Sequence, residues 1–149
     1  MRIGIVSDLH GRFDRRLYDA FADCDRVLCA GDVEREDILW QLETIAPTIA
    51  VRGNNDWALS LPQSSCIDLA GVRFFMVHIL SHARELPEGT QVVVHGHLHV
   101  PSDDVRNGVR YLNPGSTTYP RGGTHASCMI AEVENGALRN VELIALDEL

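Results

Sequence analysis

Residues 2–10 read Arg-Ile-Gly-Ile-Val-Ser-Asp-Leu-His, a short β-branched run that ends in polar side chains. Similar runs cover residues 26–30 and 48–52, and each stops at Ser, Gly or Asn, as buried parallel strands do. Segments 13–22 and 35–45, which lie between these runs, place apolar residues at helical spacing. The order βαβαβ predicts a parallel sheet with right-handed crossovers.

The pattern changes after Leu61-Pro62, where short strands joined by tight turns replace the βα repeats. Ala70-Gly71, Asn107-Gly108 and Asn135-Gly136 are expected to form these turns, because such residues tolerate positive φ. Strands and hairpins are expected at 66–70, 72–78, 91–95, 105–112, 127–133 and 138–146. We therefore predict one α/β domain, residues 1–149, made of two packed sheets.

The composition is that of an ordinary globular protein, with 45% apolar and 23% charged residues. Thirteen Lys and Arg stand against twenty-one Asp and Glu, which gives a net charge of -8. Such a chain repels polyanions, so general nucleic-acid binding through a basic face is not expected. The composition is compatible with a monomer or a homo-oligomer.

The cysteines and the amino terminus favour a cytoplasmic protein. The four cysteines form no CxxC pair, and Cys29 and Cys128 lie in apolar runs that predict buried thiols. Met1 leads directly into the first strand and leaves no room for a signal peptide. No stretch approaches the roughly 20 apolar residues that span a bilayer, so no membrane association is expected.

Metal-ligand side chains follow five of the predicted strands. The carboxyl ends of parallel strands line one rim of an open sheet, so these side chains are expected to converge. Each one alone is explained by a helix cap, a turn or a surface position, but together they predict a metal site. Oxygen ligands mixed with imidazole favour Mn, Fe, Zn or Co over calcium. The candidates are Asp8, His10, Asp32, Asn54, His78, His97 and His99.

With these motifs the sequence resembles the calcineurin-like metallophosphoesterases, especially their small single-domain bacterial and archaeal phosphodiesterases. The family motifs D-x-H, G-D, G-N-[HC]-D, H-G and G-H-x-H correspond here to Asp8-Leu9-His10, Gly31-Asp32, Gly53-Asn54-Asn55-Asp56, His78-Ile79 and Gly96-His97-Leu98-His99. The subfamily motif N-P-G-S stands at Asn113-Pro114-Gly115-Ser116. The resemblance implies a four-layer α/β-β/α sandwich of two mixed sheets, the fold of metallo-dependent phosphatases.

The resemblance also implies two divalent ions, with Mn as first choice and Fe, Zn, Ni, Co or Mg as alternatives. Asp32 would bridge them, and a shared hydroxide would attack the phosphorus of a small phosphoester or nucleotide. The ligands implied are Asp8, His10, Asp32 and His99 for one ion, and Asp32, Asn54, His78 and His97 for the other. Arg121, which lies in a Pro-Arg-Gly-Gly loop, is expected to reach a phosphate, with a solvated loop charge as the alternative.

The sequence departs from the family pattern at two positions. Asn55 stands where the family motif has His or Cys. The resemblance implies that a His at this position contacts the phosphate and protonates the leaving group, whereas an amide cannot titrate. General acid catalysis is worth about 10²–10⁴-fold, so we predict a phosphodiesterase with weak monoesterase activity. Ile79 replaces a glycine and puts the loop that presents His78 in question. The alternative function is a non-catalytic scaffold or a nucleotide-binding sensor that keeps the fold and metal site.

Several other residues have two interpretations. Trp57 is expected to pack in the core, with stacking on an aromatic leaving group as the alternative. His82 and His125 are expected to be ordinary surface residues, although either could replace the missing acid. His95 is expected to be a packed strand histidine, and Asp56 is expected to cap a turn or orient a neighbour.

Overall fold

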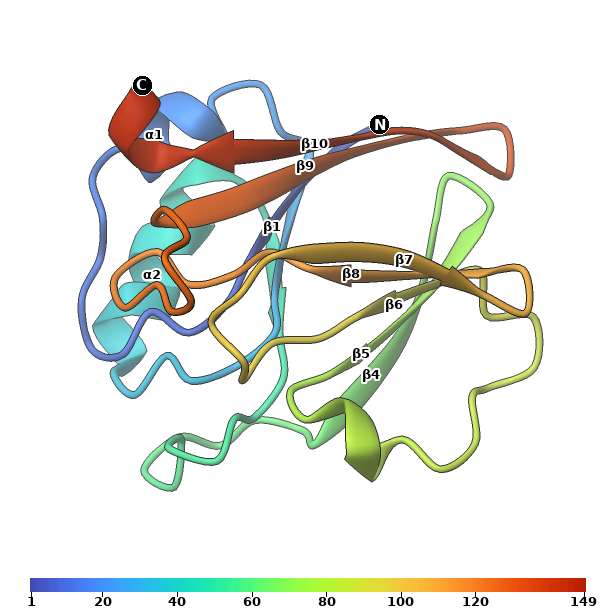
Figure 1. The fold of residues 1–149 in the computed structure, drawn as a ribbon, viewed down its shortest axis with the longest axis horizontal. Helices are drawn as coiled ribbons and strands as arrows, with labels where there is room; N and C mark the ends of the chain where they lie inside the picture. Colours follow the sequence, from blue (N-terminus) through green and yellow to red (C-terminus); the bar gives the residue numbers. More distant parts are fainter.

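The computed structural model describes residues 1–149 and contains two five-stranded mixed sheets that pack against each other (Figure 1). The first sheet has the order β10-β9-β1-β2-β3, and the second has the order β4-β5-β6-β8-β7. The elements of the first sheet and its helices are β1 (Arg2–Val6), α1 (Leu17–Ala20), β2 (Arg26–Cys29), α2 (Glu36–Ile45), β3 (Thr48–Ala50), β9 (Ser127–Glu134) and β10 (Ala137–Ala145). Those of the second sheet are β4 (Ser64–Leu69), β5 (Val72–Val77), β6 (Val92–Val94), β7 (Ser102–Arg106) and β8 (Val109–Asn113).

The βαβαβ half forms the parallel part of the first sheet, as the sequence predicts. β1 pairs with β2 and β2 with β3, all in parallel, while β9 returns antiparallel to the other edge of β1. Ile3 and Ile5 on β1 belong to the core between the sheets. Gly4 faces the helix side, where an added Cβ would lie 2.8 Å from the ring of Phe21. The alternation along β1 therefore joins the inter-sheet core to the helix layer.

The tight turns lie where the sequence places them. β4 and β5 pair across Ala70-Gly71, and β7 and β8 pair across residues 107 and 108. Asn107 and Asn135 have φ of 50° and 49°, the left-handed region that asparagine tolerates. Pairing of β7 with β8 begins at Ser102, three residues before the start of the predicted hairpin.

Two mixed sheets with few helices confirm the predicted fold class. Helices α1 and α2 lie on the side of the first sheet that faces away from β4–β8 (Figure 1). On the outer face of the second sheet, Phe75, Val77 and Val93 are covered by residues of the loop that carries η1 (Leu80–His82), and by Val109 and Tyr111. The fourth layer is therefore a loop and a 3₁₀ turn, without an α-helix.

The helix predicted over residues 13–22 was too long, because only Leu17–Ala20 is helical. The Asp14 carboxylate accepts hydrogen bonds from the backbone and the side chain of Arg16, which holds the preceding residues in a turn. Phe13 and Phe21 still pack on the helix side of the sheet, so the apolar spacing reflected burial rather than a continuous helix.

The cysteines are free thiols, as expected from their spacing. Cys29 and Cys128 are buried, and burial raises the pKa of the Cys29 thiol to about 12. A thiol in this state is inert, so neither residue competes for a metal. No helix of the structure has the length and apolar character that crossing a membrane requires.

Candidate metal centre

The seven predicted ligands come from loops that leave five different strands. Asp8 and His10 follow β1, Asp32 follows β2 and His78 follows β5. Six of the seven, all but Asn54, form two groups in which the donor atoms lie within 4.8 Å of one another. The groups are Asp8, His10 and His99, and Asp32, His78 and His97. The convergence that was expected from strand ends is therefore present in the fold.

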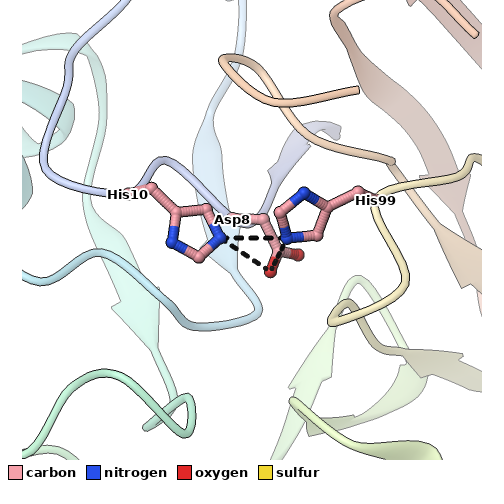
Figure 2. A group of neighbouring side chains, drawn as sticks. All are labelled: Asp8, His10 and His99. Carbon is pink, nitrogen blue, oxygen red and sulfur yellow. Dashed lines mark hydrogen bonds and ion pairs between the residues drawn. The ribbon is translucent and has the colours of Figure 1, made fainter. Parts of the chain in front are cut away.

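The first group surrounds one carboxylate oxygen (Figure 2). Asp8 Oδ1 lies 3.3 Å from His99 Nε2 and 3.6 Å from His10 Nε2. The two Nε2 atoms are themselves 2.9 Å apart. Three donor atoms thus point toward one position.

The second group adjoins the first and adds an amide oxygen. Asp32 Oδ2 lies 3.3 Å from His78 Nε2 and 3.7 Å from His10 Nε2, so it faces both groups. Asn54 Oδ1 is 3.1 Å from Nδ1 of His97, which brings Asn54 to the same edge. All seven predicted ligands consequently belong to one cluster.

Three of the histidine rings are oriented by hydrogen bonds on their far side. In each ring Nδ1 faces an acceptor, so Nδ1 carries the proton and Nε2 offers its lone pair to the centre. The acceptors are Glu34 Oε2 for His10 at 2.7 Å, the Ala30 carbonyl for His78 at 2.6 Å and the Tyr119 carbonyl for His99 at 2.6 Å. This is the tautomer that metal-binding histidines need.

The Asp8 carboxylate is held through one oxygen and left open at the other. Oδ2 accepts hydrogen bonds from the Ser7 hydroxyl at 2.7 Å and from the His97 backbone N–H at 2.9 Å. Oδ1 is buried and has no hydrogen-bond partner, and the same is true of His78 Nε2. Buried polar atoms without partners are costly, whereas a divalent cation would satisfy both. The residues present therefore fit a metal.

The Asp32 carboxylate remains ionised despite its burial. Burial alone raises the pKa of this group, but the adjacent His78 ring and the hydrogen bonds from Asn55 outweigh it and hold the pKa well below its usual range. Asn55 donates its backbone N–H to Oδ1 at 2.9 Å and its side-chain amide to Oδ2 at 3.0 Å. The predicted catalytic residue Asn55 thus contacts a predicted metal ligand directly.

The pKa values of His10 and His78 respond to the same two carboxylates. The nearby Asp8 carboxylate raises the pKa of His10 above its ordinary value, against an opposing effect of burial. Burial lowers the pKa of His78, but Asp32 and Asp8 outweigh it and leave the pKa raised. The cluster therefore attracts positive charge, which a proton or a metal ion supplies.

Asp56 joins two of the loops that carry ligands. Its buried carboxylate accepts the backbone N–H groups of Asp32 at 2.8 Å, of Gly53 at 2.8 Å and of Glu34 at 2.7 Å. Asp56 therefore caps more than its own turn, because two of the three N–H groups that it accepts belong to the loop after β2. Asp56 fixes the backbone of Asp32.

The backbone is unusual at most of the predicted ligands. Five of them have positive φ, a conformation that non-glycine residues rarely adopt and that concentrates at functional sites. The values are 56° for Asp8, 48° for His10, 56° for Asp32, 74° for His97 and 60° for His99. Glu34, which holds His10, has φ of 71°. Two motif glycines permit close approach: a Cβ at Gly53 would overlap the Asp32 carboxylate, and one at Gly96 would overlap the Ser7 hydroxyl.

The Asn-Pro-Gly-Ser segment connects two of the loops that carry predicted ligands. The Ser116 hydroxyl donates to the Asp8 carbonyl at 2.7 Å, and the Asn113 amide donates to the Gly96 carbonyl at 3.1 Å. Both residues are fully buried. The segment therefore ties the loop after β1 to the loop after β6.

Arg121 is exposed and lines a hollow of about 560 Å³ together with His10 and His99. Arg121 therefore borders the same hollow as two members of the first group. Ile79 has φ of -105°, an extended conformation that isoleucine adopts freely, so the missing glycine does not disturb the loop of His78.

The expectation of core packing for Trp57 was wrong, because its side chain is 79% exposed. It follows the buried Asp56 on a loop that turns outward, and sequence alone gives no sign of that turn. His125 and His82 are exposed as expected, and His95 is buried on the second sheet. His82 lines a hollow with Asn54 and His78.

Residues 1–136 match the sequence profile described as the calcineurin-like phosphoesterase superfamily domain. The chain belongs to the calcineurin-like phosphoesterase superfamily. A probable metallophosphoesterase of Methanothermobacter thermautotrophicus is 32% identical, and the alignment covers 93% of this chain and 89% of that one. The phosphodiesterase YfcE of Escherichia coli K12 is 29% identical over 85% of each chain. A predicted phosphoesterase of Streptococcus pneumoniae, 25% identical, has a similar structure with a TM-score of 0.76, covering 98% of this chain and 90% of that one.

This superfamily member is a metal-dependent hydrolase of phosphoric esters, and its family implies divalent metal cofactors. The expected family resemblance is thereby confirmed.

Two residues that contact the predicted ligands were not identified from the sequence, namely Glu34 and Ser7. Glu34 meets His10 across 24 positions once β1 and β2 pair, and no local spacing signals that contact.

Proposed function

We propose that this phosphoesterase is a phosphodiesterase that works with two divalent ions. The observation that carries the proposal is the position of Asp32 Oδ2, which lies 3.3 Å from His78 Nε2 and 3.7 Å from His10 Nε2. One carboxylate oxygen between the imidazoles of two ligand groups suits a bridging ligand. Two-metal sites of this kind hold their ions about 3.5–4 Å apart.

Each ion would be held by a mixture of oxygen and imidazole donors, which favours manganese as first choice. The ligands of one ion would be Asp8, His10, Asp32 and His99. Those of the other would be Asp32, Asn54, His78 and His97. The orphaned Asp8 Oδ1 and His78 Nε2 support this division, because each belongs to a different group.

Two bound ions would supply a hydroxide nucleophile and hold the phosphoryl oxygens of the ester. The chain contributes the rest. Asp32 stays ionised at neutral pH, and the far-side acceptors keep the histidine rings in the binding tautomer. Arg121 lies beside the first group, where its guanidinium would contact a phosphate.

Asn55 determines which esters are cleaved well. Its amide donates to Asp32 Oδ2, so it supports the ligand but has no titratable proton to give to a leaving group. Diesters with good leaving groups need no such proton. Alkyl monoesters do need one, and we expect slow turnover of them.

The test is hydrolysis of bis-p-nitrophenyl phosphate and p-nitrophenyl phosphate by metal-stripped protein reloaded with manganese. The proposal requires metal-dependent cleavage of the diester and none by the Asp32→Asn variant. If manganese binds but neither ester is cleaved, a non-catalytic scaffold or a nucleotide-binding sensor becomes the better account.

A further inference from the structure

Arg52 is a half-buried arginine without an acidic partner. Six of the thirteen arginines form ion pairs with carboxylates, namely Arg2, Arg16, Arg35, Arg73, Arg106 and Arg110. Arg52 instead lines a cavity of about 240 Å³. Its side chain is partly removed from solvent, yet no carboxylate of this acidic protein approaches it. A charge that is partly desolvated and unpaired is costly, and an anionic ligand in the cavity would offset that cost.

The cavity adjoins the second ligand group. Asn54 and His78, which the proposed function assigns to one ion, form part of its wall. His82 and Gln63 also line it, and both side chains can donate hydrogen bonds. A group bound here would therefore touch donors on one side and the metal ligands on the other.

The size and charge of the cavity limit what it can hold. Sites for complete ligands measure about 300–1,000 Å³, so this cavity suits a single substituent of a larger molecule. The net charge of -8 repels anions from the surface in general, and Arg52 supplies a local exception. The planar guanidinium matches phosphate oxygens in a bidentate arrangement.

We propose that Arg52, together with His82 and Gln63, binds a second phosphate group of the ester, distinct from the one that is hydrolysed. This rests on the proposed function, because the cavity is a substrate subsite only if the adjoining residues Asn54 and His78 belong to a catalytic metal centre. Arg121 lines the hollow beside His10 and His99, so the two arginines flank different ligand groups. The substrate class is then a phosphodiester that carries another phosphate.

The experiment compares two chromogenic diesters that differ only in one phosphate. One is the p-nitrophenyl ester of thymidine monophosphate, and the other is the same ester with a second phosphate on the free sugar hydroxyl. The protein is expected to prefer the second by about 10- to 100-fold in kcat/KM, the worth of a charge-assisted contact. Arg52→Gln should bring that ratio close to one, and Arg52→Lys should keep part of it.

Arg139→Gln is the matched control. Arg139 is exposed on β10 near the pairing of β9 with the start of β1, at the end of the sheet opposite to Asp8. This variant should keep the full substrate preference. No preference in the unaltered protein, or the same preference in Arg52→Gln, would overturn the proposal.

Binding separates this proposal from the proposed function. Calorimetry of the manganese-loaded protein with thymidine monophosphate and thymidine bisphosphate gives a readout that needs no turnover. If neither diester is cleaved but the bisphosphate binds more tightly through Arg52, the subsite stands and hydrolysis fails. If both diesters are cleaved equally and both nucleotides bind equally, hydrolysis stands and the subsite fails.

Discussion

At the scale of single residues, the orientation of His10 depends on Glu34. The carboxylate accepts the Nδ1 proton of the ring at 2.7 Å and thereby aims Nε2 at the centre. Mutating such a partner of a ligating histidine, here to a neutral and weaker acceptor, typically weakens metal binding about 10- to 100-fold. We expect Glu34→Gln to show a loss in this range when manganese affinity is measured by calorimetry.

The control for this change is Glu36→Gln, since Glu36 is exposed at the start of α2 and contacts no histidine. Each variant removes one negative charge, and the two positions are two residues apart in the sequence. Equal losses of affinity would show that charge alone matters and would contradict a positioning role for Glu34.

Asn55 is the second residue whose effect can be isolated. Asn55→His restores a titratable group, so the rate on an alkyl monoester should rise by up to about 10²-fold while the rate on p-nitrophenyl phosphate changes little. Steady-state hydrolysis of both esters measures this. Comparable rates for alkyl and nitrophenyl leaving groups in the unaltered protein would contradict the claim that the site has no general acid to protonate the leaving group.

At the scale of elements, Asp56 connects the loop after β3 to the loop after β2. Asp56→Asn replaces an acceptor of three backbone N–H groups by an amide that can accept fewer. Leaving buried N–H groups unsatisfied should lower the free energy of unfolding by about 2–4 kcal/mol. Urea denaturation measures this, and Asp23→Asn, at an exposed turn position, is the control.

The carboxyl terminus is tied to the loop before β9 by an exposed pair. His125 Nδ1 lies 2.8 Å from Asp147 of the terminal 3₁₀ helix η2 (Leu146–Glu148), and this hydrogen bond raises the pKa of His125 above 6.5. Because the folded pKa is the higher one, the stabilisation is present below pH 6.5 and is lost as the pH rises through the folded value. An NMR titration should show the His125 pKa falling toward 6.5 in Asp147→Asn. An unchanged pKa would mean that the pair does not form in solution.

The strand ends explain why most of the centre could be predicted. Asp8, Asp32 and His78 each follow a buried strand, and the parallel order of β1 and β2 forces the first two together. Contacts that depend on the pairing of distant segments left no trace in the local pattern. Glu34 meeting His10 and β9 joining β1 are examples.

Local periodicity was misleading at residues 13–22, where side chains at helical spacing are buried but most of the segment is not a helix. Phe13, Leu17 and Phe21 share the helix-side core, but the hydrogen bond that the Arg16 backbone N–H donates to Asp14 holds a turn there, and the helix covers only four residues. The prediction of core packing for Trp57 was wrong, because its aromatic side chain is exposed although the preceding residue, Asp56, is buried.

At the scale of the whole molecule, two sheets share one core and leave the ligand loops on a common rim. β1 contributes Ile3 and Ile5 to that core and leads into Asp8, so a buried strand also positions a predicted ligand. The loops that carry the predicted ligands adopt strained, positive-φ conformations. They are held by hydrogen bonds from three buried side chains, those of Ser7, Asn113 and Ser116. Stability of the core thus maintains the geometry of the site.

The central claim is that Asp32 is shared by two divalent ions. Anomalous diffraction from crystals of the manganese-loaded protein tests it most directly. We predict two manganese peaks, one bound by Asp8, His10 and His99 and the other by Asn54, His78 and His97, with Asp32 in contact with both. A single peak, or two peaks without Asp32 between them, would contradict the claim.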